Sequence, residues 1–330
     1  MNGYERYIAT LNGETVEHPA RTPILMRWAA EYIGETYGAF LSDHRVLVEA
    51  NLRCAHDLDL DQVSAISDPL RETEGFGGKV EIHPHSGASC EDPPLAQTLD
   101  PTLLARPDPH TSPRMRDRVE AVRLFKEKVG GRYSILGWVE GPLAEAADLR
   151  RMDNLFIDLY DGGEEVAALL DICTEVAIDF AAAQVEAGAD TIGVGDAAAS
   201  QISADLYEEW VWPREKRLVE AIHAMGARVK LHICGNITHL LPGIARLGID
   251  VLDIDHMVDL AAVRAAVGGK VALAGNVDPV QGVMQSCPEA IRRALAECRE
   301  RAAGPFLVNA GCEIPAGTPV ENLRAFCQPL

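Results

Sequence analysis

From about residue 115 onward, short apolar runs rich in β-branched residues alternate with longer amphipathic stretches. This alternation is typical of a parallel sheet built from βαβ units, because parallel strands need a crossover helix between them. Strands are predicted at 133–138, 190–194, 229–233, 250–254, 270–274 and 305–309, and two earlier runs, 22–26 and 62–66, bring the set to about eight. Eight strands close a barrel, so we predict an α/β fold of the (β/α)8 TIM-barrel type, although an open doubly wound sheet would show the same alternation.

Helices are predicted between these strands, at 163–186 (broken or doubled), 204–225, 237–247, 260–267 and 288–303. The segment 72–113 interrupts the pattern with a glycine-rich turn, an alternating run at 79–83 and a stretch rich in proline and aspartate. We interpret it as an inserted hairpin and loop over the barrel mouth. At 330 residues with 47% hydrophobic content, the chain can bury one large core, which predicts a single domain over 1–330.

The charge balance excludes several classes of partner. Fifty acidic against thirty basic residues give a net charge of -20, which repels nucleic acid and anionic membrane surfaces. The N-terminus has no secretory pattern and no apolar run is long enough for a membrane helix, so we expect a cytoplasmic protein. In a reducing compartment its eight scattered cysteines are buried hydrophobes, metal ligands or catalytic groups.

A metal site is predicted where two strands end. His232 and Cys234 lie in the run 229–236, a predicted strand that leads into a tight turn, and being two residues apart they point to the same side. Cys312 follows the last predicted strand, and in a β/α barrel such strand ends converge on one face. One imidazole and two thiolates suit zinc with an open fourth position. The same residues would also serve as small buried cysteines and a hydrogen-bonded core histidine.

Other predicted strand ends carry polar side chains, namely Glu140, Asp196, the run 253–256 (DIDH), Asn276 and Asp278. They are candidates for completing the zinc shell or orienting a substrate. Asp196 and Asp278 are also suited to be helix N-caps or turn formers, which is what aspartate most often does in such loops, and the proline after Asp278 favours that role there.

A second group of possible ligands lies in the inserted segment. His83, His85 and Cys90 are close in sequence, but proline and glycine surround them. We expect this stretch to be a solvated lid.

Several motifs together resemble the uroporphyrinogen decarboxylase superfamily, and within it the methylcobamide:thiol methyltransferases of the coenzyme M type. The resemblance covers most of the chain and rests on 141–143 (GPL), 187–196, 206–209 (LYEE), 231–236 (LHICGN), 275–279 (GNVDP) and 311–319 (GCEIPAGTP). It implies a TIM barrel with zinc on His232, Cys234 and Cys312. The decarboxylase branch carries an arginine-rich segment after its first strand, whereas the comparable run 24–30 has only Arg27.

The resemblance also implies an activity. A zinc-activated thiol would take the methyl group of a methylcorrinoid, with Glu140, Asp196, Asn276 or Asp278 orienting the acceptor. The run beginning Asp108-Pro109-His110 has proline, not glycine, at position 113, so it is no corrinoid-binding signature, and the methylcorrinoid is expected on a separate corrinoid protein. The alternatives are a porphyrinogen decarboxylase, a methyltransferase with a folate acceptor, and a zinc-stabilised docking subunit. A homodimer is compatible with this fold, because exposed barrel faces often pair.

Overall fold

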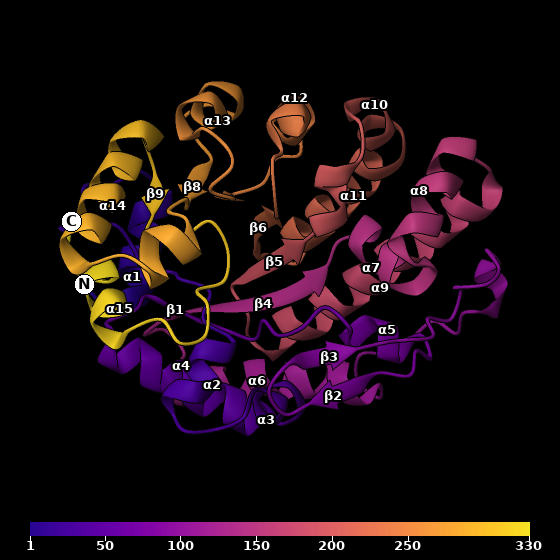
Figure 1. Cartoon of the computed structure of the whole chain (residues 1–330), viewed down its shortest axis with the longest axis horizontal. Coiled ribbons are helices and arrows are strands. Elements are labelled where there is room, and N and C mark those ends of the chain that lie inside the picture. The colour runs from indigo at the N-terminus through magenta and orange to yellow at the C-terminus, as the bar shows by residue number, and fades with distance from the viewer.

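The computed structural model describes residues 1–330, and its central feature is a curled sheet of parallel strands surrounded by helices (Figure 1). In spatial order the seven strands are β1 (Gln62–Ser64), β4 (Ser134–Glu140), β5 (Thr191–Gly195), β6 (Arg228–Ile233), β7 (Val251–Ile254), β8 (Ala272–Ala274) and β9 (Phe306–Leu307). Every neighbouring pair is parallel. The prediction of an α/β, TIM-barrel-like fold is therefore confirmed.

The segment Ala20 to Thr22 lies between the two edge strands of this sheet. The N–H of Thr22 donates to the carbonyl of Val308 at 2.9 Å, and the N–H of Val308 donates to the carbonyl of Ala20 at 2.8 Å. On the other side, the N–H of Asp61 donates to the carbonyl of Arg21 at 3.0 Å. This short segment takes the eighth position of the barrel.

The strand predicted at 22–26 is wrong, because the pairing ends at Thr22. Pro23 follows, and proline has no N–H with which to extend a ladder. The paired residues lie two positions earlier than the apolar run that suggested a strand.

The helices cover the outer side of the sheet (Figure 1). They are α1 (Gly3–Leu11), α2 (Arg27–Tyr32), α3 (Tyr37–Ser42), α4 (His44–Asp57), α5 (Arg71–Gly75), α6 (Pro113–Val129), α7 (Pro142–Arg150), α8 (Met152–Asp161), α9 (Glu164–Ala187), α10 (Ala204–Leu206), α11 (Trp212–Ala224), α12 (Leu241–Ile244), α13 (Leu260–Val267), α14 (Pro288–Ala302) and α15 (Val320–Phe326). None of them combines the length and the apolar character that a bilayer crossing requires.

Two predicted helices differ from the observed ones for local reasons. The helix predicted as broken or doubled at 163–186 is one continuous helix, α9. The helix predicted at 204–225 is interrupted by a π-helical turn, Tyr207–Val211, before α11. Pro213 stands in the first turn of α11, where its missing N–H costs little, so the chain restarts its helix there.

The inserted segment contains the predicted hairpin. Strands β2 (Glu81–His83) and β3 (Gly87–Ser89) pair antiparallel, and Gly87 supplies a positive φ of 102° at the turn. The N–H of Gly38 in α3 donates to the carbonyl of Pro84 at 3.0 Å, which ties the hairpin to that helix. Figure 1 shows the hairpin beside α3 and α5.

The inner wall of the barrel is shaped by a tryptophan and two glycines. Trp138 packs with Leu136, Ile24 and Ile66 in a cluster separate from the main core between sheet and helices. Its indole covers the neighbouring strand so closely that a Cβ at Gly193 would lie 2.1 Å from its Cε3 atom. A side chain at position 193 would therefore displace the indole, whereas a Cβ at Gly195 would lie 3.0 Å from it, a tight contact that a small shift would relieve.

Candidate metal centre at the barrel mouth

Four residues paired in register across four neighbouring strands form one row of the sheet, here called the rung, at the barrel mouth. Glu140 on β4 pairs with Gly195 on β5, Gly195 pairs with His232 on β6, and His232 pairs with Asp253 on β7. Residues paired in register on adjacent parallel strands point to the same side of the sheet. The rung lies at the C-terminal ends of the strands, where β/α barrels hold their sites.

The structure brings His232, Cys234 and Cys312 together beside this rung. His232 Nε2 lies 3.2 Å from Cys234 Sγ, which lies 3.9 Å from Cys312 Sγ. All three donor atoms lie within 4.8 Å of one another. His232 is buried and both cysteines are half-buried. The group is therefore shielded from solvent at His232 and accessible from the barrel mouth at the cysteines.

Two glycines allow the loops to bring the cysteines in. Gly235 has a φ of +88°, which favours glycine, and its N–H donates to Asp255 Oδ2 at 2.9 Å. Gly311 precedes Cys312 so close to the chain after β7 that a Cβ there would lie 2.4 Å from the backbone nitrogen of His256.

Mutual interactions set the protonation of the trio. Cys234 and then His232 stabilise the Cys312 thiolate and lower its pKa to about 4, although burial opposes this. Hydrogen bonding to Cys312, followed by burial, raises the pKa of Cys234. Burial disfavours the charged imidazole, but Cys312 and Asp253 outweigh it and raise the pKa of His232. These shifts favour a thiolate at Cys312 and the protonated forms of Cys234 and His232, so metal binding here would release protons.

The geometry of the trio fits zinc. Tetrahedral ligation at about 2.3 Å per Zn–S bond would separate two sulfurs by roughly 3.8 Å, close to the observed 3.9 Å. His232 Nδ1 is buried without a hydrogen-bond partner, on the side of the ring away from the cysteines. Metal-bound histidines use this second nitrogen for an orienting hydrogen bond.

The structure gives Asp196 a different setting from the trio. It is fully buried, its Oδ1 accepts the N–H of Ala144 at 2.7 Å, and its Oδ2 accepts that of Leu143 at 3.3 Å. Both N–H groups belong to the first turn of α7, so Asp196 caps that helix from a neighbouring strand. Burial raises its pKa to about 7.

Glu140 lies on the same rung as His232 but two strands away, roughly 10 Å at strand spacing. Its Oε1 accepts from Arg71 Nη2 at 2.7 Å, and its backbone N–H donates to Glu72 Oε1. Burial raises its pKa well above the usual range in spite of Arg71.

The two candidates after β8 mainly hold loops. Asn276 Nδ2 donates to the carbonyls of Asp255 at 3.1 Å and Val258 at 2.7 Å, which fixes the loop after β7. Asp278 Oδ1 accepts the N–H groups of Val280 and Gln281, the turn-forming role that aspartate takes before proline.

Two other groups of side chains are less suited to chemistry. His83 contacts Ser89, His85 is exposed, and the inserted segment forms no metal group. Asp43, His44 and Asp117 lie close together at the start of α4, but Asp43 caps that helix and Asp117 pairs with His44 and Arg118.

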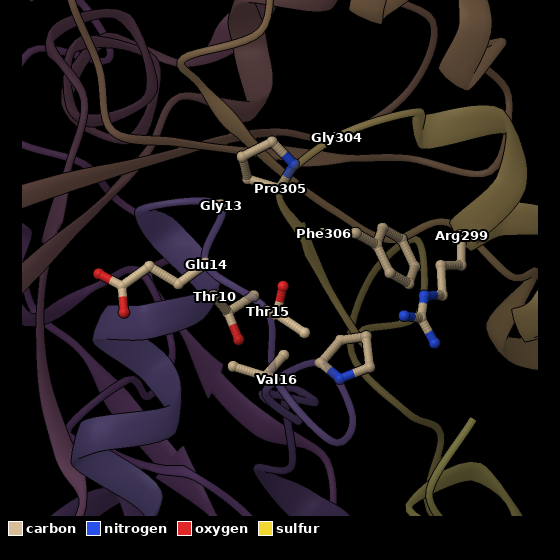
Figure 2. A pocket seen from close by; sticks show the side chains of 10 residues that line it. Thr10, Gly13, Glu14, Thr15, Val16, Arg299, Gly304, Pro305 and Phe306 are labelled. Atoms are coloured by element: carbon tan, nitrogen blue, oxygen red, sulfur yellow. The ribbon is translucent and has the colours of Figure 1, made fainter.

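A surface hollow of about 330 Å³ lies away from the metal group. Its lining comes from the end of α1 and the chain entering β9, including Glu14, Arg299 and Pro305 (Figure 2). This is the N-terminal end of the barrel, where residues usually serve stability.

Three residues lie behind His232, and none of them was assigned a role of its own by sequence reasoning, although Asp253 stands in a strand end noted as polar. Lys230, Asp253 and Asn309 are all fully buried and contact one another or His232. The sequence does contain a signal for Lys230. It precedes His232 by two residues on the same strand, so both side chains must point to the same side. A lysine facing the inside of a barrel needs a buried partner.

Comparison with known proteins places the chain in a family. A family model described as uroporphyrinogen decarboxylase (URO-D) matches residues 2–329. The chain belongs to this family. The family resemblance predicted from the motifs is thus confirmed.

The relatives of this URO-D family chain are named either as methylcobamide:CoM methyltransferases or as uroporphyrinogen decarboxylases. The methylcobamide:CoM methyltransferase MtbA of Methanosarcina mazei is 34% identical over 62% of this chain, and the match spans only 60% of MtbA. The methylcobamide:CoM methyltransferase MtaA of Methanosarcina barkeri is 31% identical over 97% of this chain and 95% of MtaA. A uroporphyrinogen decarboxylase of Prochlorococcus marinus is 26% identical over 95% of this chain and 92% of its own.

A solved structure supports the fold. A structure described as a methyltransferase from Methanosarcina mazei superposes with a TM-score of 0.90, covering 99% of this URO-D family chain and 97% of that one. The sequence identity is 24%, so this likeness establishes the architecture alone.

Proposed function

We propose that this protein is a zinc-dependent methyltransferase that moves a methyl group from a methylated corrinoid to a thiol. The observation that carries the proposal is the convergence of His232, Cys234 and Cys312 within 4.8 Å at the barrel mouth. The relatives named as methylcobamide:CoM methyltransferases, at 34% and 31% identity, support it.

His232 Nε2 and the sulfurs of Cys234 and Cys312 would hold the metal. When bound, zinc offers a fourth position at which a thiol loses its proton and becomes a strong nucleophile at neutral pH. Two cysteine thiolates would already balance the charge of a divalent ion. An acceptor thiolate added beside them would therefore keep more of its electron density for attack.

The proposed transfer balances as a simple displacement. The acceptor sulfur forms a bond to the methyl carbon while the cobalt–carbon bond breaks, and its electron pair stays on the corrinoid. The thiol proton leaves to solvent. We propose that a separate corrinoid protein carries the corrinoid and docks over the mouth, where Trp138 provides an apolar inner wall.

Of the four polar candidates, Glu140 and Asp278 are proposed to orient the acceptor or the partner. Glu140 shares the rung of His232, and Asp278 keeps its Oδ2 3.6 Å from His256 Nε2 at the rim. Asp196 and Asn276 are proposed to act only through the backbone that they hold, because both carboxylate oxygens of Asp196 and the Nδ2 of Asn276 are engaged there.

A porphyrinogen decarboxylase is the second candidate, favoured by the 26% identity to a uroporphyrinogen decarboxylase over nearly the whole chain. Arg27, the single arginine of the run 24–30, is half-exposed and pairs with Glu31, which leaves little cationic surface for a polycarboxylate. This alternative predicts turnover of a porphyrinogen without metal.

The test combines metal analysis with spectroscopy. Purified protein should contain about one zinc per chain and, with methylcobalamin and a panel of thiols, should cause loss of the methyl–cobalt absorbance. Protein that contains zinc but causes no absorbance change with any thiol would favour a docking subunit. If a folate causes the absorbance change where thiols do not, the acceptor is a folate. Decarboxylation of uroporphyrinogen by metal-free protein would establish the second candidate.

A further inference from the structure

Three polar residues form a buried layer beneath His232, inside the barrel. Lys230 is 1% exposed, and Asp253 and Asn309 are fully buried. They come from three strand segments, β6, β7 and the chain after β9, and Asp253 is the register partner of His232. Groups of this polarity are costly to bury and need partners.

Asp253 is held from two sides. Asn309 Nδ2 donates to Asp253 Oδ1 at 2.8 Å, while Lys230 Nζ lies 2.8 Å from Asp253 Oδ2 as an ion pair. The lysine offsets the carboxylate charge in the dry interior, and the asparagine fixes the carboxylate plane. The other carboxylate oxygen, Asp253 Oδ2, does not contact Asn309 and faces both Lys230 and His232.

His232 Nδ1 lies 3.7 Å from this same Oδ2 and has no hydrogen-bond partner, although it is buried. A small rotation of the ring would shorten the contact to hydrogen-bond length. The opposite ring nitrogen, Nε2, already faces Cys234. With Nδ1–H donated to Asp253, the imidazole is in the tautomer whose Nε2 lone pair faces the two sulfurs.

We propose that Asp253, held by Lys230 and Asn309, is the positioning residue that fixes the tautomer and orientation of His232 for metal binding. The inference rests on the proposed zinc site and deepens it. Asp253 touches neither acceptor nor corrinoid in this scheme, so its effect is on zinc affinity. Carboxylate partners of metal-bound histidines are typically worth roughly 10- to 100-fold in metal affinity.

The test measures zinc affinity by competition with a chromophoric chelator in wild type, in Asp253→Asn and in the double variant Lys230→Gln/Asp253→Asn. In the double variant no cation competes for the amide oxygen at position 253, so the oxygen stays with Asn309 while an NH2 group faces His232 and favours the wrong tautomer. We expect zinc affinity to fall roughly 10- to 100-fold. The single variant leaves Lys230 buried without its counterion, whereas the double variant removes both charges and should keep the fold.

A matched control is Asp61→Asn at the other end of the barrel. Asp61 is also fully buried and ion-paired, with Arg6 Nε at 3.1 Å, but it precedes β1 and lies far from the mouth. Its loss should lower stability and leave zinc affinity as in wild type.

The outcomes separate the two claims. Reduced zinc affinity in the folded double variant, with unchanged affinity in Asp61→Asn, supports the inference. A folded double variant that binds zinc like wild type overturns it while the proposed zinc site stands. Wild-type protein that binds no zinc overturns both.

Discussion

Cys234 and Cys312 are 78 residues apart in the chain, yet their sulfurs lie 3.9 Å from each other at the barrel mouth. Their separation matches two thiolates on one tetrahedral metal. Because neither cysteine can be replaced by a neighbouring donor in the same group, each should be essential to metal binding.

Replacing one of these sulfurs should abolish both metal content and methyl transfer. In Cys312→Ala, we expect zinc affinity to fall by more than the roughly 10- to 100-fold that an outer-shell partner is worth. Cys287→Ala is the control, since Cys287 is an exposed cysteine at the start of α14. Full zinc content and full transfer in Cys312→Ala would refute the proposed site.

Zinc should stabilise the fold as well as activate a thiol. Binding to the native state alone adds about 2.7 kcal/mol when free zinc is 100 times its Kd. A chelator should therefore lower the Tm of the wild-type protein but leave Cys312→Ala unchanged. Calorimetric scans of both proteins with and without chelator check this, and an equal shift in both would point to a metal bound elsewhere.

A side chain at position 193 should destabilise the inner wall of the barrel. Gly193→Ala places a Cβ 2.1 Å from the Trp138 ring, so the indole must move. Overpacking of this kind costs about 1–3 kcal/mol, measurable by urea unfolding. Gly269→Ala, which meets no atom within 4 Å, should leave stability nearly unchanged, and a similar loss in both variants would contradict the packing argument.

The buried Asp196 should make stability depend on pH. Its pKa is raised from 3.8 to about 7, mainly by burial, so the folded state favours the protonated form. This contribution is fully present below pH 4 and is lost as pH rises toward 7, by at most about 1.4 kcal/mol per pH unit.

Asp196→Asn tests that dependence. The amide cannot ionise, so its stability deficit relative to wild type should shrink between pH 5 and pH 8, as followed by urea unfolding. Asp153→Asn on the exposed side of α8 serves as control and should show no such trend. A deficit that stays constant with pH would show that Asp196 keeps its charge in the native state.

Much of the architecture follows from local periodicity. The run 229–236 predicted a strand with His232 and Cys234 on one side, and β6 covers Arg228–Ile233 with both side chains in one group. The helix at 260–267 was predicted to the residue. Both patterns depend on side chains a few residues apart, whose relative directions the backbone geometry alone determines.

Contacts between distant segments were decided by the tertiary structure. The sequence could not show that Asp253 lies beside His232, because strand register depends on the packing of the whole barrel. Nor could it show that Asp196 caps α7, since that requires two neighbouring strands to end at the same level.

The amino-acid sequence alone therefore determined the order of the seven sheet strands and the shared side of His232 and Cys234, since these depend on short-range geometry. Only the tertiary structure decided that Cys312 joins His232 and Cys234, and that Lys230, Asp253 and Asn309 lie beneath them. Closure through Ala20 to Thr22 joins the edge strands β1 and β9, so that segments from both halves of the chain share one mouth.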